Sequence, residues 1–74
     1  MMQPRDPLEA YLRLQTVKTI MFTFGEIEAI LGRELPPAAY NSDGWWWGGQ
    51  PSWVNAGWQV INLDRENEKV RFSH

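Results

Sequence analysis

The sequence contains no cysteine and only one histidine, His74. Without thiols the chain can form no disulfide, no thiolate metal site and no cysteine nucleophile. A zinc site needs several converging ligands and a serine triad needs an internal histidine, so His74 supports neither. Glu26 and Glu28 stand two residues apart, which on a helix turns them about 200° from each other, so they form no carboxylate pair. We therefore expect no metal, no cofactor and no enzymatic activity.

Long apolar runs are also absent. The start of the chain, Met1–Asp6, shows no basic segment followed by an apolar stretch, so no signal peptide is visible. We expect a cytoplasmic protein with no membrane partner. Its 74 residues, of which 43% are hydrophobic, predict a single folded domain over residues 1–74. The net charge of −2 argues mildly against a strongly basic nucleic-acid binder.

Tryptophan, in contrast, is abundant: all five tryptophans lie between residues 45 and 58. A strand sends alternate side chains to opposite faces, and a helix spreads three successive side chains over about 200°. The run Trp45–Trp47 therefore cannot enter one core as a group. We expect Trp53 and Trp58 to be buried, and part of Trp45–Trp47 to lie on a surface or interface.

Caps and breaks along the chain predict its elements. Thr23 and Glu26 form a capping box before an apolar helical stripe, and Gly32 ends that helix. Residues 41–44 and 48–51 are rich in turn residues and predict breaks, after which Ser52 would cap a helical turn. The predicted order is helix 6–15, strand 16–22, helix 24–31, a short helix over 35–40, a helical turn at 52–57, and strands 58–63 and 69–73.

This order is typical of a winged helix, and we predict an α+β, winged-helix-like domain. It would contain three or four short helices and a small three-stranded antiparallel sheet, in which the first strand pairs with the C-terminal hairpin. The second and third helices would form a helix-turn-helix with Gly32–Leu35 as the turn, and the hairpin would be the wing. The alternative is a small α+β domain with the same elements, whose third helix is too broken to read a groove.

An ordered set of motifs supports a shared fold. It runs through T-F-G-E-I-E-A-I-L-G at Thr23–Gly32, Leu35-Pro36, Trp45-Trp46, Ala56-Gly57-Trp58 and Val70-Arg71-Phe72. The set resembles a small uncharacterised bacterial and phage domain family with the pattern T-F-x-E-I-E-x-I-L-G, L-P, W-W, A-G-W and V-x-F. The similarity covers roughly residues 11–73. It implies a shared fold and carries no settled activity.

Two binding functions remain open. In the first, which we favour narrowly, a helix-turn-helix and wing bind nucleic acid (DNA), since arginine and lysine position phosphates and asparagine can read adenine. Its candidate residues are Arg33, Tyr40, Asn41, Arg65, Lys69 and Arg71. In the second, an exposed tryptophan patch binds a protein, as expected of an inhibitor or adaptor encoded by a phage or mobile element. Its candidate residues are Trp45, Trp46, Trp47 and Gln50. The sequence leaves open whether the protein is a monomer or a homodimer.

Overall fold

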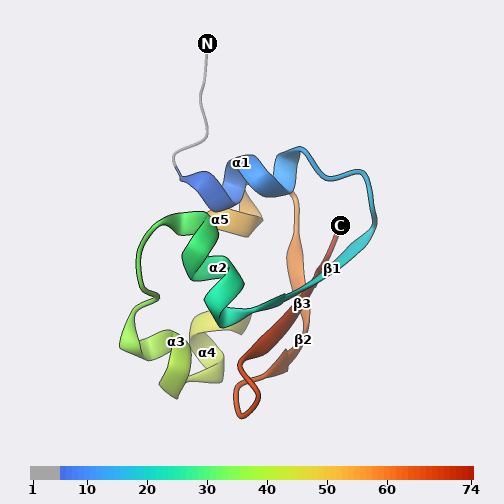
Figure 1. Cartoon of the computed structure of the whole chain (residues 1–74). Helices are drawn as coiled ribbons and strands as arrows, with labels where there is room; N and C mark the ends of the chain where they lie inside the picture. Colours follow the sequence, from blue (N-terminus) through green and yellow to red (C-terminus); the bar gives the residue numbers. More distant parts are fainter. Residues whose placement is uncertain (1–5) are drawn as a thin grey trace.

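The computed structural model describes residues 6–74, which form an α+β fold with an antiparallel sheet. The elements are α1 (Pro7–Arg13), β1 (Thr19–Thr23), α2 (Phe24–Leu31), α3 (Pro37–Asn41), α4 (Asp43–Trp47), α5 (Pro51–Val54), β2 (Gln59–Asp64) and β3 (Lys69–Ser73). The helices gather on one side of the sheet and leave its other face open (Figure 1). Residues 1–5, which belong to the segment in which no signal peptide was visible, lie outside the described residues.

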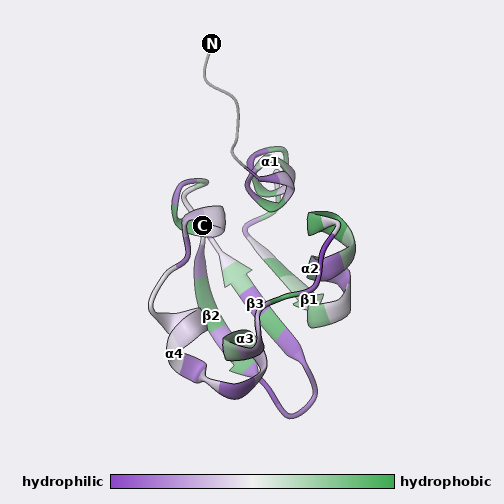
Figure 2. Ribbon diagram, turned by 90° about the vertical axis from the view of Figure 1, so that its left-hand side faces the viewer, coloured by the Kyte–Doolittle hydropathy of each residue, from purple (hydrophilic) through white to green (hydrophobic). Residues whose placement is uncertain are grey.

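The sheet has the strand order β1-β3-β2, so the first strand pairs with the last, as predicted. Along β3, Val70 and Phe72 are buried, whereas Lys69 and Arg71 are exposed on the opposite face. Figure 2 shows the corresponding alternation of hydrophobic and hydrophilic residues along the strands. In β2 the register shifts between Val60 and Asn62, which leaves Ile61 as a bulge residue.

The core lies between the sheet and the helices and is built around a stack of aromatic rings. Trp46 lies between Phe24 and Trp53, with ring centroids 4.8 and 5.6 Å apart. Trp53 also contacts Phe72 of the sheet at 5.1 Å. Each large aromatic side chain buries roughly 150–250 Å², so these few rings supply much of the apolar burial that so short a chain needs.

Side-chain caps are present at α1 and α2, and the one at α2 is the capping box predicted from the sequence. Asp6 accepts the Glu9 N–H at 2.8 Å, and Thr23 and Glu26 close a capping box. Gly32 follows α2 with a φ of 73°, a left-handed conformation that glycine adopts without a Cβ clash. Both ends of α2 are therefore set by residues next to it in the sequence: the capping box at its start and Gly32, whose N–H donates to the Glu28 carbonyl, at its end.

Two local predictions are wrong. The turn expected at residues 41–44 is nearly absent, because only Ser42 separates α3 from α4. Ser52 does not cap α5, whose N-cap is Gln50; its hydroxyl instead donates to Asp6 at 2.7 Å. That bond joins α5 to the start of α1. The helix-turn-helix and winged-helix interpretation of these elements stays a prediction.

Candidate functional site

The tryptophan run lies on the single turn of α4, which spreads its side chains over three environments. Trp46 is 0% exposed, and its indole N–H donates to the Ala39 carbonyl at 2.7 Å. The prediction that Trp46 belongs to a protein interface is therefore wrong. Trp45 is half-buried against Trp46 and Trp53, at 4.9 and 5.8 Å between ring centroids. Trp47 is 53% exposed. The helix thus separates these residues, and no patch of three exposed tryptophans exists.

Trp45 borders a cleft of about 340 Å³. Its apolar lining comes from α1, α2, the segment after α2, α4 and α5, and comprises Leu8, Ile27, Leu31, Leu35, Pro36, Trp45, Pro51 and Trp53. Polar side chains complete the lining: Asp6, Arg33, Glu34, Gln50 and Ser52. Three residues predicted for two different functions, Arg33, Trp45 and Gln50, therefore meet at one place.

Most polar groups of this cleft already bind one another. The Asp6 carboxylate accepts the Glu9 N–H and the Ser52 hydroxyl, and the Gln50 amide donates to the Trp45 carbonyl at 3.0 Å. Arg33 and Glu34 are different: both are exposed, and within residues 6–74 neither side chain makes a hydrogen bond or ion pair. The cleft therefore combines an apolar floor with one available charge of each sign.

The α3 candidates are less available for a ligand. The Tyr40 hydroxyl donates to the Glu28 carboxylate at 2.8 Å, and this bond is the main reason that the pKa of Tyr40 is raised to about 12. The same carboxylate oxygen accepts the Leu35 N–H at 2.8 Å. Glu28 is half-buried, and its two bonds tie α2 to α3 and to the connection between them. Asn41 is exposed at the end of α3.

Arg65, expected to reach phosphates from the wing, is held by its own chain. Its guanidinium pairs with Asp43 at the start of α4 and donates to the Tyr40 carbonyl at 3.1 Å. The residue therefore ties the β2–β3 turn to the α3–α4 junction. Its charge is already paired with the Asp43 carboxylate, so it is a weak contact for a phosphate.

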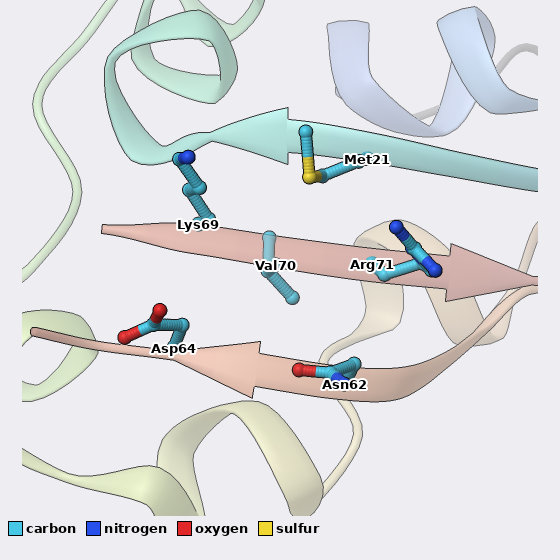
Figure 3. Close-up of a pocket in the computed structure, with 6 residues that line it drawn as sticks. All are labelled: Met21, Asn62, Asp64, Lys69, Val70 and Arg71. Atoms are coloured by element: carbon cyan, nitrogen blue, oxygen red, sulfur yellow. The ribbon is translucent and has the colours of Figure 1, made fainter. Parts of the chain in front are cut away.

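Lys69 and Arg71 lie on the open face of the sheet. A shallow depression of about 170 Å³ crosses the strands there and is lined by Met21, Asn62, Asp64, Lys69, Val70 and Arg71. Figure 3 shows these side chains coming from β1, β3 and β2 together. In the register, Arg71 stands opposite Met21 on one side and Asn62 on the other. Sequence reasoning missed Met21 and Asn62, because neither belongs to a motif.

The six nucleic-acid candidates therefore do not form one surface. Arg33 lies at the cleft, Tyr40, Asn41 and Arg65 lie around α3, and Lys69 and Arg71 lie on the open face of the sheet. The exposed residues of α3 are Pro37, Ala38 and Asn41, so α3 presents no cation to a groove. The predicted residues thus fall into three groups: Lys69 and Arg71 on the sheet, Tyr40 and Arg65 at the α3–α4 junction, and Arg33, Trp45 and Gln50 at the cleft.

His74, the one histidine of the sequence, has defined contacts. Its ring packs on Trp58, with centroids 4.4 Å apart, and its backbone N–H donates to the Lys18 carbonyl at 3.1 Å. Among residues 6–74, no three histidine, aspartate or glutamate side chains are grouped closely enough to hold a metal ion. No helix in this part of the chain has the length and hydrophobicity needed to cross a membrane.

Comparison with known proteins adds a family to this geometry. The sequence model of the domain of unknown function DUF7662 matches residues 6–74. The chain belongs to this family. The match confirms the resemblance to an uncharacterised domain family that the ordered motifs indicated. No curated protein and no solved structure matches the chain.

Proposed function

We propose that the protein is a non-enzymatic module that binds a short segment of another protein in the cleft beside Trp45. The observation that carries this proposal is the cleft with a mainly apolar lining that Trp45 of α4 borders. Ligand sites usually occupy about 300–1,000 Å³, and the cleft, at about 340 Å³, lies at the small end of that range. Its size suits one or two large side chains of a partner.

The chemistry of the lining favours a protein segment over a small polar metabolite. Specific metabolite sites need several convergent polar groups, whereas Asp6, Ser52 and Gln50 already bind within the chain. An apolar anchor in a desolvated pocket needs few polar partners, and such anchors supply most of the affinity of protein interfaces. Arg33 at the rim then offers a contact for a carboxylate beside the anchor.

The groove-reading alternative has less support from the same geometry. A helix-turn-helix protein places its second helix in the major groove and needs cations nearby for phosphates. Here α3 has five residues, Tyr40 is bonded to Glu28, and Arg65 is paired with Asp43. The inhibitor or adaptor function is therefore the better candidate, with the cleft in place of the predicted tryptophan patch.

Selection from a library of displayed random peptides tests this proposal. We expect enriched peptides to share an aromatic or large aliphatic residue, and Trp45→Ala to weaken their binding about tenfold or more, equivalent to about 1.4 kcal/mol. Trp47→Ala is the matched control, because Trp47 does not line the cleft. Arg33→Glu is a second variant that should weaken binding. It should leave folding intact, because the Arg33 side chain is exposed.

Urea unfolding of each variant separates lost binding from lost structure. The proposal fails if no peptide is enriched beyond the background measured with an unrelated immobilised protein of similar size. It also fails if folded Trp45→Ala and Arg33→Glu bind the selected peptides with the dissociation constant of the unchanged protein.

A further inference from the structure

We infer a second site, independent of the cleft, on the open face of the sheet: Arg71, Lys69 and Asn62 contact backbone phosphates of single-stranded nucleic acid. The two cations are on the central strand β3, and Asn62 comes from the neighbouring strand β2. Lys69 and Arg71 were predicted as wing contacts to phosphate, and Asn62 was not predicted. The site differs from the predicted surface because none of its residues belongs to α2 or α3.

The donors of this face have no competing partners. Within residues 6–74, the side chains of Arg71, Lys69 and Asn62 make no hydrogen bond and no ion pair. One acid, Asp64, lines the same depression and stands opposite Lys69 in the register. Its two carboxylate oxygens accept from Asn67, at 3.1 and 2.8 Å. Arg71 has uncharged neighbours on both sides, Met21 and Asn62. A ligand anion would therefore meet an available guanidinium, an ammonium and an amide.

The spacing of these donors suits a chain of phosphates. Lys69 and Arg71 are two residues apart on one face of a strand, which separates their backbones by about 6.6 Å. This is close to the separation of successive phosphates along an extended single strand. Arginine binds a phosphate through two parallel N–H donors, and asparagine side chains add hydrogen bonds to phosphate oxygens.

The surrounding side chains favour a polyanion over a protein partner. The register places Thr19 opposite Ser73 on one side of β3, and Gln59 opposite Ser73 on the other. Hydroxyl and amide groups commonly bind phosphate and sugar. Protein interfaces, in contrast, have cores that are depleted of charge. The exposed apolar residues here, Met21 and Ile61, are too few for such a core.

Asp64 is the one acid among the residues that line the depression, and most other acidic side chains lie on other elements. Glu9 is on α1, Glu26 and Glu28 are on α2, and Glu66 and Glu68 are in the β2–β3 turn. The open face is thus locally basic on a chain of net charge −2. We expect modest affinity with a small salt dependence, because a single-strand ligand releases about 0.7 counterion for each phosphate neutralised.

Fluorescence anisotropy with a labelled mixed-sequence single-stranded oligonucleotide tests this inference. For the full chain we expect binding at low salt, with a slope of log K against log salt of about −1.4 for two phosphate contacts. The double variant Arg71→Gln, Lys69→Gln should lose at least about tenfold in affinity and most of that slope. Arg33→Gln removes an exposed cation outside the face and should change neither.

The competing outcomes each overturn the inference. Absence of binding at low salt, or an equal loss with Arg33→Gln, would remove the site. Tighter binding to a duplex of the same sequence would contradict the single-strand assignment, and equally tight binding to polyglutamate would make the face a contact for acidic protein. Trp45→Ala should bind the oligonucleotide normally, so failure of the cleft proposal and failure of this one give different results.

Discussion

Neighbouring tryptophans of α4 differ sharply in what they contribute to folding. Trp46 is enclosed by Phe24 and Trp53, and its indole N–H is bonded to the Ala39 carbonyl, whereas Trp47 is 53% exposed. We predict that Trp46→Ala lowers the free energy of unfolding by about 3–5 kcal/mol, because it leaves a cavity and an unpaired carbonyl. Trp47→Ala should change it by no more than about 0.5 kcal/mol.

Urea unfolding of both variants checks this difference with the same chemical change at adjacent positions. Similar losses for the two variants would contradict the observed orientation of α4.

The raised pKa of Tyr40 leads us to predict a loss of stability at alkaline pH. Its pKa is raised from 10.0 to about 12, first by the hydrogen bond to Glu28 and then by burial. A group whose folded pKa exceeds its unfolded pKa contributes stability that is complete below the unfolded value. That contribution should therefore be present below pH 10.0 and be lost as the pH rises towards about 12.

Absorbance of the tyrosinate form measures this titration. Tyr40→Phe should remove the transition near pH 12, and Glu28→Gln should move it down towards 10.0. A titration that is unchanged in Glu28→Gln would show that the Tyr40–Glu28 bond does not cause the shift.

At the scale of elements, α2 depends on its capping box. The Glu26 N–H donates to the Thr23 hydroxyl at 3.1 Å, and the Glu26 carboxylate accepts the Thr23 N–H at 2.8 Å. We expect Thr23→Ala to lower the free energy of unfolding by about 1 kcal/mol, the usual cost of losing an N-cap. Glu26→Gln retains a side-chain acceptor and should cost less. Thermal unfolding of both variants measures this difference. A larger loss of stability for Glu26→Gln than for Thr23→Ala would contradict the prediction.

The elements that the sequence predicted are those controlled by neighbouring residues. The α2 helix and its stop at Gly32 follow from caps, and β3 follows from the alternation of Val70 and Phe72 with polar residues. The α4 helix was missed because residues 41–44 favour turns. Burial of Trp46 between two rings outweighs that local preference.

The candidate sites were predicted only in part, for reasons of topology. Lys69 and Arg71 share a face because residues of a strand alternate, and this spacing is visible in the sequence. Asn62 joins them only through the bulge at Ile61, which shifts the register of β2. The cleft is assembled from five separate segments, so no spacing along the chain reveals that Arg33 and Trp45 share it.

For the whole molecule, we propose a main binding function at the cleft and a separate anion contact on the sheet. Both depend on one division of the fold: the helices cover one face of the sheet and enclose the cleft, and the other face stays open. A partner at the cleft should therefore perturb the helical side of the molecule and leave the open face unchanged.

The indole N–H signals of the five tryptophans allow the most direct measurement, by heteronuclear NMR during titration with a peptide selected on the protein. We predict that the signals of Trp45 and Trp53, which line the cleft, shift in proportion to bound peptide. The signals of Trp47 and of Trp58, whose indole is bonded to the Leu12 carbonyl, should stay in place. A shift of Trp47 with Trp45 unchanged would contradict the cleft as the binding site.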